Sequence, residues 1–170
     1  SVLWLVAEGP TSERNLKNEA TARGVNSERL IFAPRMSLAE HQARLQLADL
    51  FLDTLPYNAG ATASDMLWAG LPVLTRIGDT FVGRMAASLL NAVRLPELIT
   101  TTPEAYERMA IELATHPERL AAIKHKLAEN RLNTPLFDTE LFTKHLEAAY
   151  TMMYERHRTG LAPDHIVISD

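Results

Sequence analysis

Short apolar runs alternate with longer amphipathic segments over the first 100 residues of the chain. The apolar runs lie at residues 2–7, 30–33, 49–53 and 72–75, and each is followed by a segment with the spacing of a helix. Continuous apolar runs of this length are typical of strands buried in a parallel sheet. The pattern therefore predicts an α/β fold, with a mostly parallel sheet and flanking helices.

Capping signals predict where the helices between these strands begin and end. Ser12 is expected to cap the first helix, which ends near Gly24. Ser37, with Glu40 three residues later, forms a capping box for the second helix, and Gly70 is expected to end the third. The expected helices span residues 12–24, 37–47, 61–69 and a segment after Gly78-Asp79-Thr80 that runs through Leu90.

The last third of the chain has a different pattern. From Pro103 onward it predicts three helices, at about 103–115, 117–131 and 138–158, and strands are expected to be largely finished by residue 100. The last of these helices carries a broad apolar surface that we expect to be partly exposed and to promote self-association. Its members are Leu141, Phe142, His145, Leu146, Ala149, Tyr150, Met152, Met153 and Tyr154.

Composition restricts the class of protein. The 170 residues are 46% hydrophobic and 22% charged, as expected of one globular domain. The net charge of −4 argues against a nucleic-acid partner, and no apolar run is long enough to suggest a membrane span. The absence of cysteine excludes disulfides and thiolate chemistry and is compatible with the cytoplasm, our expected location. Because the chain opens inside an apparent strand without Met, we expect a fragment of a longer protein.

The loops that follow the strands are the expected ligand site. In open α/β sheets ligands bind beyond the carboxyl ends of the strands, so loops 7–12, 34–41, 54–62 and 76–82 should line one crevice. The helix that opens at Ala61 presents unpaired backbone N–H groups, which favour an anion. This arrangement is typical of a phosphate or nucleotide pocket.

Four side chains are candidates for contacts with such a ligand. Thr62 and the backbone around it are placed to hold phosphate oxygens, and Asp65 is placed to accept hydrogen bonds from a ribose. His41 and Arg44 lie one turn apart on the preceding helix and are suited to flank a planar base. The alternative for each is an ordinary solvated residue near a helix start.

Other conspicuous residues are expected to be structural. Trp68, Met66 and Leu67 are expected in the core, and Lys124-His125-Lys126 is expected on a solvated helix face. No pair of histidines has the spacing of a zinc site, and no Ser-His-Asp set can be assembled. The sequence therefore gives metal and nucleophilic catalysis little support.

Several stretches, in order along almost the whole chain, carry a resemblance to a known family. The chain resembles the C-terminal catalytic half of the O-GlcNAc transferase/SPINDLY family. The similar stretches are Ser1–Leu5, Arg29–Pro34, Leu47–Asp49, Leu52–Thr54, Asn58–Thr75, Gly78–Phe81, Arg84–Ser88, Pro96–Ile99, Arg131–Phe137 and Gly160–His165.

The resemblance implies a GT-B glycosyltransferase, in which two Rossmann-like domains close over a UDP-sugar and this chain is the second, nucleotide-binding domain. The implied reaction is inverting transfer of N-acetylglucosamine from UDP-GlcNAc to Ser or Thr of a protein, with no metal or other cofactor. By position, His41 and Arg44 match family residues at the uracil and ribose, Thr62 matches a hydroxyl at the diphosphate, and Asp65 matches the carboxylate on the ribose.

The chain departs from the family pattern at the phosphate turn. Many members have His-Thr-Thr where this chain has Gly60-Ala61-Thr62, and Leu38 replaces a lysine of animal members. The family's other phosphate contacts and its acceptor-side histidine would lie upstream of residue 1, in an N-terminal catalytic half. Its tetratricopeptide repeats, which recruit acceptor proteins, are also absent here. We therefore assign no general base and expect this chain alone to be inactive.

Two alternatives remain beside this interpretation. One is a related GT-B transferase that uses another nucleotide sugar or another acceptor, since the shared nucleotide contacts do not distinguish the sugars. The other is a non-catalytic module that binds a nucleotide or a partner protein, with catalysis lost through the changes at Gly60 and Ala61.

Overall fold

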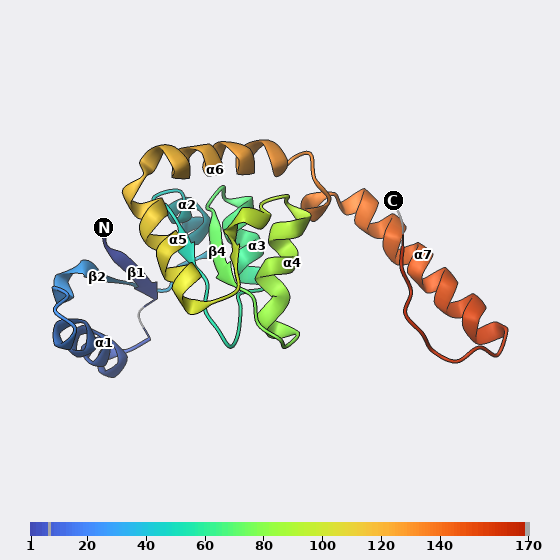
Figure 1. Cartoon of the computed structure of the whole chain (residues 1–170), viewed down its shortest axis with the longest axis horizontal. Helices are drawn as coiled ribbons and strands as arrows, with labels where there is room; N and C mark the ends of the chain where they lie inside the picture. The colour runs from blue at the N-terminus through green and yellow to red at the C-terminus, as the bar shows by residue number, and fades with distance from the viewer. Residues whose placement is uncertain (7, 169–170) are drawn as a thin grey trace.

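The computed structural model describes residues 1–6 and 8–168, and its strands form two parallel sheets (Figure 1). Near the N-terminus, β1 (Leu3–Val6) pairs with β2 (Leu30–Ala33), with Leu3 opposite Leu30. The second sheet has the order β3-β4-β5, formed by Phe51–Leu52, Val73–Arg76 and Ile99–Thr100. The parallel α/β architecture expected from the sequence is therefore confirmed, whereas β5 was not predicted. Ala7, expected in the first strand, lies outside the described residues.

The helices follow the strands as expected. α5 lies on one side of β4 and α3 and α4 on the other, while α6 runs across one end of this layer (Figure 1). The helices are α1 (Pro10–Ala22), α2 (Leu38–Leu45), α3 (Ala61–Trp68), α4 (Met85–Ala92), α5 (Pro103–Thr115), α6 (Pro117–Asn130) and α7 (Thr139–Arg158). Short 3₁₀ turns occupy Ser27–Arg29, Val82–Arg84, Pro96–Leu98 and Pro135–Phe137. Among the described residues, no helix combines the length and apolar character needed to cross a bilayer.

Two of the predicted caps are confirmed and one is wrong. Ser37 and Glu40 form the expected capping box at α2. The Ser37 hydroxyl and, secondarily, the Ser37 backbone N–H donate to the Glu40 carboxylate and lower its pKa. Gly70 ends α3 with a φ of +85° in a Schellman motif. Ser12 does not cap α1, because the helix already begins at Pro10, whose fixed φ suits a first helical position. The Ser12 hydroxyl instead donates to the carbonyl oxygen of Gly9 at 3.0 Å.

The core surrounds β4. Leu67, Val73, Leu74, Leu90 and Leu98 are fully buried there, between the second sheet and the helices that cover it. By contrast, α1 and α7 have no buried residue. The free energy of apolar burial is therefore concentrated in the middle of the chain.

Of two expectations about side chains, the one for Trp68 needs correction. Met66 is buried as expected, but Trp68 is 51% exposed, because it lies at the last turn of α3, where its ring packs edge-on against Phe137. The segment around Lys124 lies on a solvated helix face as expected, and its lysines form ion pairs there. Lys124 forms an ion pair with Asp49 at 3.0 Å and Lys126 forms one with Glu97 at 2.7 Å.

Candidate nucleotide site

The turn between β3 and α3 is closed by a buried carboxylate. Asp53 is the first residue after β3 and is only 5% exposed. Its Oδ1 accepts the backbone N–H of Ala59 at 2.7 Å, and its Oδ2 accepts the hydroxyl of Thr75 at 2.6 Å. One side chain thus joins the end of the turn to the neighbouring strand β4.

Asn58 holds the same turn from inside. Its Nδ2 donates to the carbonyl oxygens of Thr54 at 2.8 Å and Arg76 at 3.4 Å, and its backbone N–H donates to Val82. Its Oδ1 is buried and has no hydrogen-bond partner among the described residues. The amide therefore ties the turn to the end of β4 and to the loop that follows it.

A helix from the other side of the sheet supports this network. The hydroxyl of Tyr106, on α5, donates to the carbonyl oxygen of Asp53 at 2.8 Å. Burial, and secondarily the nearby charge of Asp53, raise the pKa of Tyr106 to about 12. The hydroxyl of Thr100, on β5, donates to the carbonyl oxygen of Thr75 at 2.9 Å. The network thus extends through β3, β4, β5 and α5.

This turn leads directly into the start of α3, where the sequence predicts the phosphate contacts. Gly60 is the N-cap, and no side chain of residues 1–6 or 8–168 caps the helix. The first helical hydrogen bond runs from Ser64 to Gly60, and the N–H groups of Ala61, Thr62 and Ala63 have no partner among the described residues. The helix start is therefore an open set of hydrogen-bond donors with the positive end of the helix dipole behind it.

The predicted ribose carboxylate lies one turn into the same helix. Asp65 is half-buried, and within residues 1–6 and 8–168 its carboxylate has no hydrogen-bond or ion-pair partner. Thr62 is exposed at the helix start. Both acceptor and donor groups on α3 are thus available to a ligand.

The predicted base contacts lie on the neighbouring helix α2, which packs beside α3. Arg44 Nε donates to Nδ1 of His41 at 3.2 Å, and Arg44 Nη1 donates to the carbonyl oxygen of Pro34 at 2.9 Å. The guanidinium also lies 5.7 Å from the centre of the Trp4 ring. Because Nδ1 of His41 accepts, the neutral ring carries its proton on Nε2, which can donate to a ligand.

The loop after β4 closes tightly beside the turn. Gly78 donates its N–H to the carbonyl oxygen of Gly83 at 2.7 Å, and Gly83 donates to Thr80 Oγ1 at 3.0 Å. A Cβ built on Gly83 would lie 3.0 Å from Thr80 Oγ1 and 3.3 Å from the Cα of Gly78. The backbones meet this closely because the loop carries glycine at these positions.

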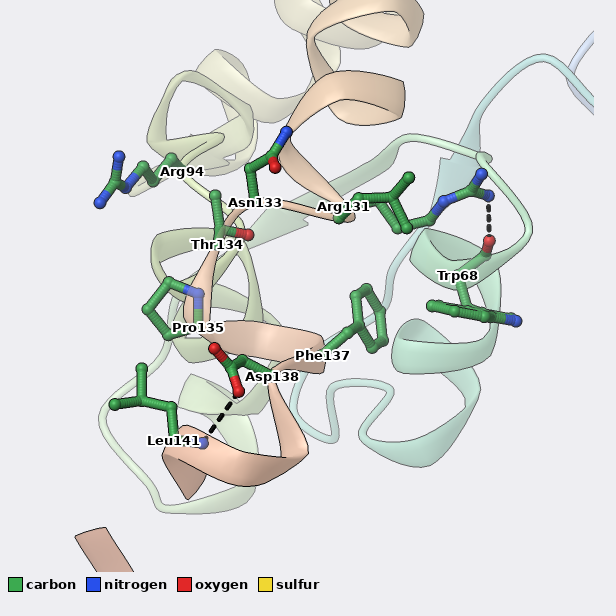
Figure 2. A pocket seen from close by; sticks show the side chains of 10 residues that line it. Trp68, Arg94, Arg131, Asn133, Thr134, Pro135, Phe137, Asp138 and Leu141 are labelled. Atoms are coloured by element: carbon green, nitrogen blue, oxygen red, sulfur yellow. Dashed lines mark hydrogen bonds between the residues drawn. The ribbon is translucent and has the colours of Figure 1, made fainter. Parts of the chain in front are cut away.

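Two cavities lie away from these residues. The first, of about 420 Å³, lies between the end of α3 and the segment that joins α6 to α7 (Figure 2). Arg131 borders it and donates from Nη1 to the carbonyl oxygen of Trp68, while its buried Nε has no partner among the described residues. The second, of about 360 Å³, shares Trp68, Phe137 and Asp138 with the first and extends to Phe142. None of the predicted nucleotide contacts lines either cavity.

Comparison with known proteins agrees with this architecture. The family model described as "Glycosyl transferase family 41" matches residues 1–146. The chain belongs to this family. The resemblance found in the sequence is thereby confirmed.

Relatives within the family include plant and animal proteins. A probable UDP-N-acetylglucosamine–peptide N-acetylglucosaminyltransferase SEC of Arabidopsis thaliana is 36% identical over 99% of this chain. A UDP-N-acetylglucosamine–peptide N-acetylglucosaminyltransferase of Caenorhabditis elegans is 32% identical over 98%. The chain spans only 17% and 14% of the lengths of these two relatives.

A solved structure confirms the fold. A mutant of the Thermobaculum terrenum O-GlcNAc transferase superposes with a TM-score of 0.84 and 33% identity, covering 90% of this chain and 30% of that protein. The expected fold class, a Rossmann-like parallel sheet with flanking helices and a helical last third, is therefore confirmed, because it matches the GT-B domain of that transferase.

The buried network behind the turn was not predicted from the sequence. Asp53 and Thr75 each stand at the carboxyl end of an apolar run, and β3 and β4 are parallel neighbours, paired as Phe51 with Val73. Polar residues that end adjacent parallel strands meet at the same sheet edge. That coincidence was the available signal, and it required knowing that these two strands are adjacent.

Proposed function

We propose that this chain is the UDP-binding half of an inverting, metal-independent protein O-glycosyltransferase, which transfers N-acetylglucosamine from UDP-GlcNAc to Ser or Thr. The observation that carries the proposal is the unpartnered N–H set at the start of α3, with the free carboxylate of Asp65 one turn later. Family membership and the printed names of the relatives support the donor and the acceptor.

Each predicted contact has a role in this proposal. His41 and Arg44 hold the uracil and ribose, and Asp65 accepts from the ribose hydroxyls. The backbone of Gly60 and Ala61, with the backbone and hydroxyl of Thr62, holds the diphosphate. The pairing of Arg44 with His41 supports this assignment, because it orients the imidazole before the nucleotide arrives.

The chemistry assigned to this half is stabilisation of the leaving group. When the bond between the sugar and UDP breaks, negative charge grows on a diphosphate oxygen. Preorganised N–H donors at a helix start stabilise such charge in the role that a divalent cation has in other enzymes. Inversion requires the acceptor hydroxyl to attack from the opposite side of the sugar and to lose its proton to a base. We assign that base to no residue of this chain.

The rest of the reaction belongs to the longer protein in this proposal. An N-terminal catalytic half supplies the remaining phosphate contacts and the acceptor side, and tetratricopeptide repeats recruit the protein acceptor. The small share of the relatives' length that this chain spans supports such a division. We place the whole enzyme in the cytoplasm, in line with a sequence free of cysteine.

Calorimetric titration with UDP, GDP and UDP-GlcNAc, in EDTA, tests the proposal. We expect UDP-selective binding without metal, weakened about tenfold to a hundredfold in Asp65→Ala, because a lost charge-assisted hydrogen bond costs roughly 1.5–3 kcal/mol. Asp164→Ala is the matched control, since Asp164 pairs with Arg156 near the C-terminus. Affinity for UDP that changes less than about twofold in Asp65→Ala would show the site assignment to be wrong.

A nucleotide-binding module without catalysis is the second candidate. Gly60 and Ala61 favour it, because they remove the imidazole and one hydroxyl that many family members have at the phosphates. Turnover by the full-length protein separates the two candidates, and competition between UDP-GlcNAc and other UDP-sugars identifies the donor.

A further inference from the structure

The phosphate turn has little side-chain support on its ligand side. Tyr57 is exposed, Gly60 and Ala61 offer no polar side chain, and no side chain caps α3. The position of the donors therefore depends on what holds the backbone from behind. That support comes from Asp53, whose carboxylate accepts the N–H of Ala59, the residue just before the N-cap.

Burial of the Asp53 carboxylate behind the turn is energetically unfavourable in itself. A buried carboxylate is costly unless its oxygens are satisfied, and among the described residues Asp53 has no cationic partner. Both oxygens instead accept from neutral donors, the Ala59 N–H and the Thr75 hydroxyl. The two bonds have different effects. The bond from the Ala59 N–H holds the turn, and the bond from the Thr75 hydroxyl holds the carboxylate against β4. An apolar residue would fill the same volume without either restraint.

We propose that Asp53 and Thr75 are positioning residues, which hold the Ala59–Thr62 backbone so that the amides at the start of α3 meet the diphosphate of the nucleotide. This inference rests on the proposed function of the site. The two side chains touch no substrate and act only through the turn. Preorganisation of this kind matters because donors that are already oriented need no rearrangement as charge develops.

A pair of matched substitutions tests the inference. Thr75→Val removes the hydroxyl that anchors Asp53 at nearly constant volume. Thr100→Val removes a similar buried hydroxyl, whose bond goes to the carbonyl oxygen of Thr75 and not to the carboxylate. Both variants should lose similar thermal stability. Thr75→Ser keeps the anchoring hydroxyl and is the conservative rescue.

Two readouts separate a positioning role from a general structural one. In amide hydrogen exchange, the Ala59 N–H, which donates to Asp53, should exchange faster in Thr75→Val, whereas in Thr100→Val it should exchange as in the unmodified chain. In titrations with UDP, Thr75→Val should weaken binding about tenfold, the effect of losing one buried hydrogen bond, while Thr75→Ser and Thr100→Val stay within about twofold. In the full-length enzyme, Thr75→Val should lower kcat more than it raises KM, because the oriented donors act most on the transition state.

The outcomes distinguish this inference from the proposed function. Equal losses of UDP affinity in Thr75→Val and Thr100→Val, or unchanged affinity and exchange in Thr75→Val, would overturn the positioning role while Asp65→Ala still reports on the site. Absence of UDP binding by the unmodified chain and by the full-length protein would instead refute the proposed function. The exchange comparison would then still decide whether Asp53 and Thr75 hold the turn.

Discussion

The N-terminal unit, formed by β1, α1 and β2, and the central body, from α2 to the turn before α7, are built from the same kinds of element but differ in burial. Among the described residues of the N-terminal unit, Leu30 and Ala33 alone are buried, and β1 is exposed along most of its length. In the central body β4 is buried over Val73–Thr75 and covered by helices on both sides. Parallel sheets are normally covered on both faces, so the central body alone follows the rule for its class.

The C-terminal helix α7 extends the contrast. It projects away from the central body in Figure 1, and the tail after it runs back along it, held by an ion pair between Arg156 and Asp164. Its apolar side chains, including Phe142, Tyr150 and Tyr154, are largely exposed. The expected exposure of this surface is therefore confirmed, while the expected self-association stays a prediction. The candidate nucleotide site therefore lies on the part of the chain that has its own core.

The largest expected effect contrasts a leucine from each region. Leu67→Ala, in the core of the central body, should lower the free energy of unfolding by about 3 to 4 kcal/mol, because it leaves a cavity among packed side chains. Leu16→Ala, on exposed α1, should cost less than about 1 kcal/mol. Urea denaturation followed by circular dichroism measures both. Similar losses at the two positions would contradict the contrast.

The second effect concerns the exposed face of α7. The chain should self-associate in sedimentation velocity as its concentration rises, since exposed apolar patches of this kind drive association. Replacing Phe142 and Tyr150 together with Gln should weaken that association more than about tenfold, because each buried aromatic ring contributes roughly 1.5–3 kcal/mol. Lys144→Gln is the control on the same helix. A chain that stays monomeric at all tested concentrations would show that the exposed apolar face of α7 does not drive self-association.

The third effect is a pH dependence inside the central body. The pKa of Tyr106 is raised to about 12 in the folded chain, whereas an unfolded tyrosine titrates near 10. The folded state therefore binds this proton more tightly, and the stability gained from it is complete below pH 10 and is lost as the pH rises from 10 to 12. Tyr106→Phe should cost about 1 kcal/mol at pH 8, through the lost bond to Asp53, and should flatten the decline at high pH.

Denaturation midpoints at pH 8 and pH 11 measure this effect. Tyr150→Phe is the matched control, because Tyr150 is exposed on α7. If the unmodified chain and Tyr106→Phe declined equally between the two pH values, Tyr106 would not be the group responsible.

Features of the fold that depend on a few consecutive residues were predicted from the sequence. Features that depend on contacts between residues distant in sequence were not. The capping box of Ser37 and the C-cap at Gly70 were predicted because a few consecutive residues determine them. Trp68 was wrongly expected in the core. The spacing of apolar residues along a helix does not show which of its turns are covered by other elements. β5 was missed because two residues carry no periodicity.

The candidate site divides in the same way. The helix start at Ala61 was predicted from the residues themselves. The candidate roles of His41, Arg44 and Asp65 were also inferred from the residues, and the family resemblance implied the same nucleotide contacts. The bond between Asp53 and Thr75 joins residues 22 positions apart, so it depends on the pairing of β3 with β4. No local pattern specifies that pairing.

The smallest expected effect lies within the central body, where α3 and α4 end in the same backbone motif but carry different residues at its left-handed position. α3 ends in a Schellman motif with Gly70 in the left-handed region, and α4 ends in the same motif with Arg94 at a φ of +57°. A side chain at such a φ is strained, so Arg94→Gly should stabilise the chain by about 0.5 to 1 kcal/mol, even after the extra freedom that glycine gives the unfolded state. Thermal denaturation would detect this as a small rise in Tm.

The reciprocal substitution, Gly70→Ala, tests whether backbone conformation causes this effect. A Cβ on Gly70 would meet only the end of Arg131, at 3.9 Å, so Gly70→Ala adds backbone strain without a clash and should destabilise by about 1 kcal/mol. Opposite signs for the two variants would assign the effect to backbone conformation. A loss of stability in Arg94→Gly would show that the Arg94 side chain, which borders the cavity beside α7, contributes more than its strained backbone costs.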